Sequence, residues 1–260
     1  MAVLRMFVRV SWAKAMEYKA DFGFMAMTIL LNLASSILFW VFLSASSLTI
    51  VDWSYPELVI YACVMTLGQT FGEFFFGLGE LPYAIMSGQI DVWMTKPLSV
   101  YAMLVGANLN LGYILAKFVL AAISLGMGII YFQIPIAFTM VVFMFILMII
   151  GTLVNQLFQL AIYALAYWVD KVDFLSQLFY QFQDFLQYPL DCFPNLVRYG
   201  LTFVLPYALV SYYPSLALLG RLGENWPMIL LLYVIILIIF TFISVTMVRL
   251  GEKHYDSNGG

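Results

Sequence analysis

The chain has 260 residues, of which 64% are hydrophobic and only 10% are charged. A soluble domain carries charge on about a quarter of its residues, so this composition excludes water as the main solvent and indicates an integral membrane protein. The net charge of −3 does not set the orientation, because orientation follows the positions of Lys and Arg rather than their balance with the acids.

Long uncharged segments predict the membrane spans. A helix of about 20 apolar residues crosses about 30 Å of hydrocarbon. The segments without Asp, Glu, Lys or Arg that reach this length are Phe22–Val51, Pro97–Ala116, Phe118–Val169 and Asn225–Val248. The first of them is too long, and the charge before it too dispersed, for a cleaved signal peptide.

The N-terminal part is predicted to contain a surface helix and two spans. Residues 1–21 combine four basic residues with Trp12 and aliphatic side chains, which favours an amphipathic helix in the headgroup layer. Phe24–Ser47 is the first predicted span and Leu58–Gly79 is the second. The second contains four glycines and Glu73, so we expect it to pack against other helices rather than face lipid.

The segment after the second span, about residues 81–98, is too polar for hydrocarbon and is interrupted by Pro82, Gly88 and Pro97. It predicts a short helix at the membrane surface. The third and fourth spans follow at about Ala107–Phe132 and Ala137–Trp168, with a turn around Pro135 between them.

The last part of the chain is predicted to contain two more spans. A fifth helix runs from Phe174 to about Tyr188. Four prolines then indicate that Pro189–Arg221 forms short helices that re-enter the membrane from the far face. Trp226–Val248 is the sixth span, and residues 250–260 form a polar tail.

The predicted fold is therefore an all-α integral membrane protein with six transmembrane helices within residues 22–249 and both termini in the cytoplasm. This arrangement places eight of the 11 cations on the cytoplasmic side and two outside, in accord with the positive-inside rule. A seventh crossing at Tyr199–Gly220 would move Arg249 and Lys253 outside, so six crossings are preferred.

Catalytic signatures are missing from the sequence. It contains no Gly-x-x-x-x-Gly-Lys-Ser/Thr phosphate loop, no Ser/His/Asp set and no His/Cys cluster of metal-ligand spacing. We therefore do not expect an enzyme, an ATP-hydrolysing subunit, a bound metal or a cofactor of its own, and nothing indicates a nucleic-acid partner. The two cysteines, Cys63 and Cys192, fit unpaired thiols.

A motif follows the second span: Gly88-Gln89-Ile90-Asp91-Val92-Trp93-Met94-Thr95-Lys96-Pro97-Leu98. It resembles the Gly-x-Ile-Asp-x-x-Leu-x-Lys-Pro-Leu signature of permeases from the bacterial type-two ATP-binding-cassette (ABC) exporter superfamily, with Met94 in place of a Leu. Tyr18–Phe22 and Val204–Pro214 resemble further family patterns, and the resemblance covers the whole chain.

The resemblance implies an assembly in the bacterial inner membrane. In the family, the segment between the second and third spans is a coupling helix that docks on a cytosolic ATPase subunit, which implies this role for Gly88, Asp91, Lys96 and Pro97. A second permease chain, identical or different, would complete a dimer with the pathway between the two chains. The ATPase subunits would bind ATP and Mg²⁺, and residues 189–221 would cover the exit. The alternative for Gly88 and Pro97 is that they only end a surface helix.

Polar residues of the fifth helix are candidates for contact with substrate. Helical spacing places on one face the side chains of Gln177, Gln181, Asp184 and Tyr188, with Phe185 among the aromatic neighbours. A carboxylate among aromatic rings would favour an amphiphilic or lipophilic compound, including a cationic one. The alternative is that this face packs against the partner chain and that Asp184 lies at the wet end of the helix.

Charges at membrane depth are the remaining candidates. Glu73 and Lys117 are expected to form an ion pair, with a proton or substrate site as the alternative. Gly106 and Asn110 are expected to share a helix face with Lys117. A polar stripe of the fourth span suggests hydrogen bonds between helices; it consists of Thr152, Asn155, Gln156, Gln159 and Tyr163.

Two other classes of protein fit the same sequence. An ion-gradient-driven secondary transporter could use Glu73, Lys117 or Asp184 as its coupling group, although no internal repeat or matched pair of broken helices supports it. A membrane scaffold without transport activity is the other alternative.

Overall fold

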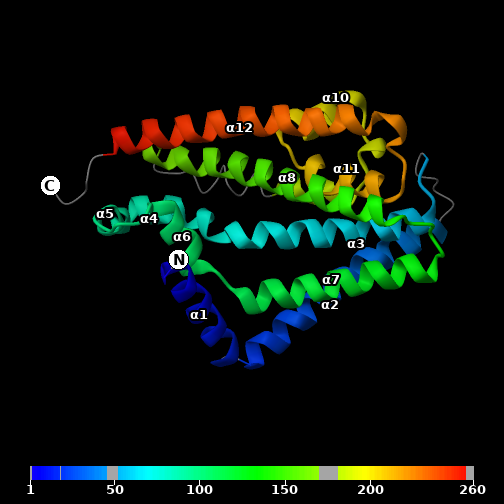
Figure 1. Cartoon of the computed structure of the whole chain (residues 1–260), viewed down its shortest axis with the longest axis horizontal. Coiled ribbons are helices and arrows are strands. Elements are labelled where there is room, and N and C mark those ends of the chain that lie inside the picture. Colours follow the sequence, from blue (N-terminus) through cyan, green and yellow to red (C-terminus); the bar gives the residue numbers. More distant parts are fainter. Residues whose placement is uncertain (1, 18, 46–51, 170–180, 256–260) are drawn as a thin grey trace.

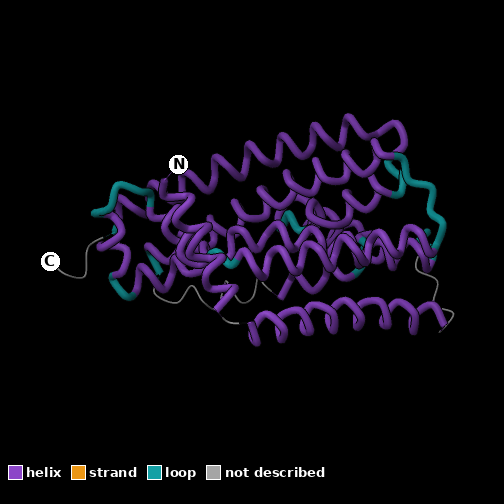
Figure 2. The backbone as a smooth tube through the Cα atoms, turned by 60° about the horizontal axis from the view of Figure 1, so that its bottom comes forward, coloured by secondary structure: helices purple, strands orange, loops and turns teal. Residues whose placement is uncertain are grey.

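The computed structural model describes residues 2–17, 19–45, 52–169 and 181–255, and all regular structure within them is helical. The helices lie lengthwise in a bundle with most loops at its two ends (Figure 1, Figure 2). Helices in this part of the chain that are long and apolar enough to cross a membrane are Tyr55–Met86, Leu111–Tyr131, Phe138–Tyr167 and Gly223–His254. A pair bent by 107°, Asn195–Val204 and Ala208–Leu218, would be a fifth. The structure thus supports a membrane protein, while six crossings stay a prediction.

The N-terminal helix packs against a short non-helical interruption between two later helices. α1 (Ala2–Glu17) precedes α2 (Lys19–Ala45), and the break separates α6 (Val100–Asn108) from α7 (Leu111–Tyr131). The buried Ser11 hydroxyl accepts a 2.7 Å hydrogen bond from the backbone N–H of Leu111. This N–H lies in the first turn of α7, where no helical acceptor exists.

The break corrects the predicted span Ala107–Phe132. Asn110 is the N-cap of α7 and accepts a 3.1 Å bond from the N–H of Tyr113, while Leu109 has an extended backbone. Gly106 therefore belongs to α6, and the expectation that it shares one helix face with Lys117 is wrong.

The second span is a succession of helical segments. It begins at α3 (Tyr55–Gly72), where the N–H of Ser54 donates 2.7 Å to the carboxylate of Glu57 and caps the helix. The helix tightens to 3₁₀ geometry in η1 (Glu73–Glu80) and continues as α4 (Leu81–Met86). Helical structure therefore extends beyond the predicted end at Gly79, and the short helix α5 (Gln89–Met94) follows.

Glycines allow three helices to pack closely at the centre of the bundle. α11 (Ala208–Leu218) lies against α3 and against α8 (Phe138–Tyr163), which ends in η2 (Ala164–Tyr167). A Cβ atom on Gly68 of α3 would lie 2.7 Å from the Val210 carbonyl oxygen, and one on Gly151 of α8 would overlap the Leu209 carbonyl. Both positions therefore exclude any larger residue without movement of α11.

Gly151→Ala is expected to lower the free energy of unfolding by about 1–3 kcal/mol, because the added methyl group collides with backbone and not with a flexible side chain. Denaturant titration in mixed micelles measures this change. Gly126→Ala is the matched control, since a Cβ on Gly126 meets nothing within 4 Å, and it is expected to be neutral or slightly stabilising. Equal stability of the two variants would contradict the packing described here.

A network around Asp191 connects the proline-rich segment to the start of α3. The segment contains η4 (Leu190–Cys192), α10 (Asn195–Tyr199) and the π-helical η5 (Gly200–Val204). The Asp191 carboxylate accepts hydrogen bonds from the Trp53 indole at 2.8 Å and the Tyr212 hydroxyl at 2.9 Å, and it pairs with Arg198 at 3.4 Å. These bonds hold the short helices predicted for residues 189–221 against the bundle.

The last long helix runs along the full length of the bundle. η6 (Gly223–Asn225) leads into α12 (Trp226–His254), which lies alongside α8 and ends near α5 (Figure 1). Helical structure extends beyond the predicted end of the span at Val248. Along the way, the Tyr233 hydroxyl donates 2.8 Å to the Leu209 carbonyl of α11.

Candidate functional site

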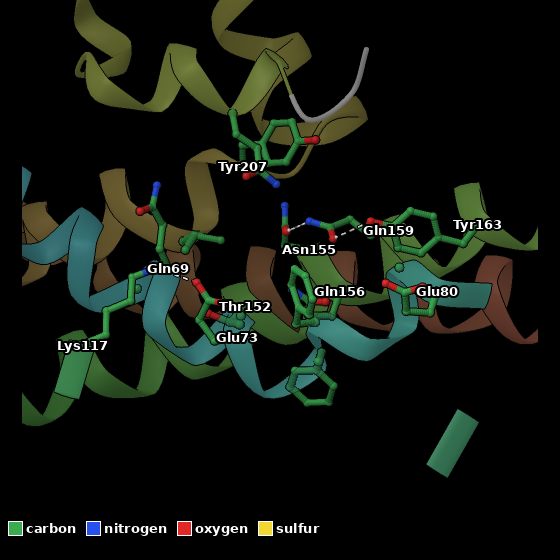
Figure 3. A pocket seen from close by; sticks show the side chains of 17 residues that line it. Gln69, Glu73, Glu80, Lys117, Thr152, Asn155, Gln156, Gln159, Tyr163 and Tyr207 are labelled. Atoms are coloured by element: carbon green, nitrogen blue, oxygen red, sulfur yellow. Dashed lines mark hydrogen bonds and ion pairs between the residues drawn. The ribbon is translucent and has the colours of Figure 1, made fainter. Parts of the chain in front are cut away.

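A polar cavity of about 410 Å³ lies inside the bundle. Its walls come from α3, η1, α7, α8, α11 and η3 (Gln183–Gln187), so segments distant in sequence meet around it (Figure 3). Such a concentration of polar side chains is costly at membrane depth, and residues of this kind typically mark a functional pathway.

An ion pair forms one wall of the cavity. Lys117 Nζ of α7 lies 2.6 Å from Glu73 Oε1 of η1, and the two side chains are 12% and 22% exposed. The Lys117 ammonium also lies 5.6 Å from the centre of the Tyr113 ring. The structure thus brings together the two charges that the sequence analysis paired, and each neutralises the other within the bundle.

The polar stripe of α8 forms another part of the cavity wall, with Thr152 beside Glu73 (Figure 3). The Gln159 amide donates 2.7 Å to Asn155 Oδ1, and the Tyr163 hydroxyl donates 3.5 Å to Gln159 Oε1 (Figure 3). Both bonds join residues of α8 itself, so the expectation that these side chains bond to another helix is wrong for these two bonds. The stripe presents its polar atoms to a cavity instead.

Two buried polar atoms of this stripe have no hydrogen-bond partner in the described part of the chain. They are Thr152 Oγ1 and Asn155 Nδ2, on residues that are 3% and 5% exposed. Buried polar groups are hydrogen-bonded in the great majority of proteins, because an unpaired one costs about 1–3 kcal/mol. Both atoms belong to residues of the cavity wall, and a small rotation of either side chain would be needed to turn the atom toward a bound molecule.

Glycines of the second span keep the cavity open. A Cβ on Gly72 would lie 3.2 Å from the Gln156 amide nitrogen, and one on Gly79 would lie 3.6 Å from the Tyr163 hydroxyl. Side chains at these positions would occupy the space between η1 and α8. The glycines of this span therefore have two effects: some leave room for the cavity, and others allow close helix packing.

The stripe predicted for the fifth helix is only partly described. Gln177 lies outside the described residues, and so does the side chain of Asp184. Gln181 is exposed, and Phe185 stacks on Phe182 with ring centres 5.9 Å apart. Gln183, which the sequence analysis did not select, is the residue of this segment that lines the cavity.

Tyr188 corrects the predicted helical face. Gln183–Gln187 is a 3₁₀ helix and Tyr188 has an extended backbone, so an α-helical face does not continue to it. The Tyr188 ring packs instead against α2, with centres 5.7 Å from Phe39 and 6.1 Å from Trp40.

The segment that carries the Gly88–Leu98 motif lies at the end of the bundle, with α5 at its tip (Figure 1). Gly88 separates α4 from α5 with a φ of +69°, in the left-handed region that favours glycine. Lys96 and Pro97 are exposed, whereas Asp91 is half-buried. Val92 and Met94 of α5 are also exposed, which leaves an apolar surface on this short helix.

Contacts with the end of α12 hold α6, the helix that follows this segment, in place. The Tyr101 hydroxyl of α6 donates 3.1 Å to Glu252 and lies 3.4 Å from the Tyr167 hydroxyl. Gly251 packs directly on the Tyr167 ring, where a Cβ would overlap it. Burial and the neighbouring Asp91 carboxylate raise the pKa of Tyr255 to about 12, so its hydroxyl is protonated at neutral pH beside α5.

A family model described as "ABC-2 family transporter protein" matches residues 30–259. The chain therefore belongs to this family, which confirms the resemblance seen in the Gly88–Leu98 motif. It is a multi-pass membrane protein and an ABC-type permease, of a family whose members are typically non-catalytic membrane subunits that work with ABC ATPase subunits. No curated protein and no solved structure matches the chain.

Several residues of the cavity wall were not predicted from the sequence. Gln69 and Glu80 recur with Glu73 at spacings of four and seven residues, and this pattern could have revealed a polar face. Gln183 and Tyr207 carry no such signal, because separate segments contribute them. The role of Asp191 in joining the proline-rich segment to α3 was also missed.

Proposed function

We propose that the chain is the permease subunit of an ATP-driven exporter of the bacterial cytoplasmic membrane. In this proposal it forms the pathway for an amphiphilic or lipophilic compound, and separate cytosolic ABC ATPase subunits bind ATP and Mg²⁺. A second permease chain completes a dimer. The proposal assigns no catalytic residue, metal or cofactor to the chain itself.

The segment 81–98 carries the proposal. It combines an exposed apolar surface at Val92 and Met94, the exposed cation Lys96, and a buried face. Leu81, Ile85 and Ile90 of that face share an apolar cluster with Tyr167, against which Val248 of α12 also packs. A soluble partner that binds such a segment displaces the long helices with it, since the segment is not a loose loop. This is what a coupling helix requires.

The proposed topology has six crossings and both termini in the cytoplasm. α2 and the segment around residues 174–188 would add two crossings to the four long spans. The network around Asp191 and the 107° bend would then lie at the outer surface, where residues 189–221 cover the exit. Arg198 and Arg221 would lie there too, and Lys96 would lie inside.

Val92→Asp is expected to reduce recovery of the ATPase subunit about tenfold when the tagged chain is purified from its native membranes, because a charge would be buried in an apolar contact. Quantitative mass spectrometry of the purified complex measures the ratio of the two subunits. Leu196→Asp is the control, since Leu196 is also exposed but lies at the opposite end of the bundle.

Two results would contradict the proposal. One is a wild-type chain that yields no ABC ATPase subunit, and the other is purified chain that transports cargo in vesicles without nucleotide. The second result would favour the ion-gradient-driven alternative, with the Glu73–Lys117 pair as its coupling group.

A further inference from the structure

The charges of the cavity wall leave its interior close to neutral. Glu73 is compensated by Lys117 at 2.6 Å. Glu80 lines the cavity without an ion pair among the described residues, but it is exposed, and solvent there screens its charge. A ligand beside the Glu73–Lys117 pair therefore meets charges that already compensate each other, and an ionic head group there would lose its hydration without a free counter-ion.

The uncharged polar groups of the wall both donate and accept hydrogen bonds. Asn155 Nδ2 is an unpaired donor, and the unpaired Thr152 hydroxyl can donate and accept. Glutamine side chains of the wall also carry a carbonyl and an amide each; they are Gln69, Gln156 and Gln183, together with Gln159, which already bonds Asn155 and Tyr163. Hydroxyl groups match this wall, since each hydroxyl is itself a donor and an acceptor.

Aromatic side chains provide an apolar part of the site. Phe75 and Phe76 line the cavity, and Phe76 is 64% exposed, so the cavity reaches the surface of the chain beside this ring. The volume of about 410 Å³ is in the range of small-molecule sites. It accommodates a compact head group while an attached hydrocarbon chain remains outside, against Phe76.

We infer that this cavity binds the uncharged, hydroxyl-rich head group of an amphiphile of the glycoside type, with its alkyl chain along Phe76. The inference rests on the proposed function, because it names the class of compound that the permease receives. On binding, the Thr152 and Asn155 side chains turn toward the head group, which supplies the acceptor that Asn155 Nδ2 lacks and a partner for the Thr152 hydroxyl.

Binding of radiolabelled octyl β-glucoside to the wild-type chain in nanodiscs tests the inference, without nucleotide and without an ATPase subunit. Saturable binding above that of empty nanodiscs is expected. Octyltrimethylammonium and octyl sulfate have the same alkyl chain with charged heads, and each is expected to show at least about tenfold weaker saturable binding.

Thr152→Val and Asn155→Leu are each expected to weaken octyl β-glucoside binding about tenfold, because each removes hydrogen bonds at nearly constant volume. Thr241→Val is the matched control. The Thr241 hydroxyl bonds the Leu237 carbonyl within α12, and Thr241 does not line the cavity. The Thr241→Val variant should therefore bind octyl β-glucoside with the affinity of the wild type. Thr152→Val keeps the test valid if Asn155→Leu does not fold, since Asn155 also accepts from Gln159.

The inference is overturned if octyltrimethylammonium or octyl sulfate binds as tightly as octyl β-glucoside, if no saturable glucoside binding occurs, or if Thr152→Val binds like the wild type. Failure of the proposed function looks different. Binding that depends on Thr152, together with no ATPase partner and no ATP-dependent transport, would support the ligand class and contradict the exporter.

Discussion

Asp91→Asn with Lys96→Gln is expected to reduce ATP-dependent transport about tenfold or more while the chain still inserts into the membrane. Lys96→Gln would remove the exposed positive charge that pairs with the ATPase subunit in the proposal, and Asp91→Asn would remove the negative charge of the half-buried carboxylate beside Tyr255. Transport into inverted vesicles, normalised to the amount of inserted chain, measures the effect together with ATP hydrolysis.

The single variants separate the two contributions. Lys96→Gln is expected to weaken binding of the ATPase subunit, whereas Asp91→Asn is expected to preserve binding and to lower the transport obtained per ATP hydrolysed. Lys253→Gln is the control, because Lys253 is another exposed cation at the end of α12. Unchanged transport in the double variant would refute the coupling role of residues 88–97.

Lys117→Met is expected to lower the free energy of unfolding by about 3–5 kcal/mol, because it leaves the Glu73 carboxylate without a counter-charge inside the bundle. Glu73→Gln alone is expected to have a similar effect, because it leaves the largely buried ammonium of Lys117 without a counter-charge. The double variant should recover most of the loss, since a buried ion pair and an uncharged pair of similar volume differ little in stability.

Denaturant titration of the four proteins in mixed micelles gives this double-mutant cycle. Glu80→Gln is the control, because Glu80 is exposed and forms no ion pair within the described residues. A double variant as unstable as the sum of the two single variants would show that the contact between Glu73 and Lys117 contributes nothing to folding.

The sequence predicts the helices of this protein better than its interruptions. Long uncharged runs can be buried in lipid only as helices, which is why α8 and α12 fall close to their predicted positions. The break before α7 depends on a single N-cap bond of Asn110 and on Ser11 of α1. The bond between Ser11 and Leu111 joins residues 100 positions apart, so no local sequence pattern predicts it.

The candidate site shows the same limit. Glu73 and Lys117 could be paired in advance because each is costly alone in a membrane. The cavity beside them could not be predicted, because its wall joins side chains from six elements, and its space depends on glycines whose neighbours are known only from the fold. Gln183 enters the wall through a 3₁₀ helix that periodicity arguments do not anticipate.

α12 has 29 residues and a proline only in its first turn, so it is a continuous rod about 43 Å long. Its last turn is held against α6 by Glu252 and against η2 by Gly251, and Tyr233 near its other end bonds the Leu209 carbonyl of α11. A stiff rod fastened at both ends conveys an axial shift of even one ångström across the whole bilayer. If α5 docks on the proposed ATPase subunit, α12 would therefore link the two faces of the membrane mechanically within this one chain.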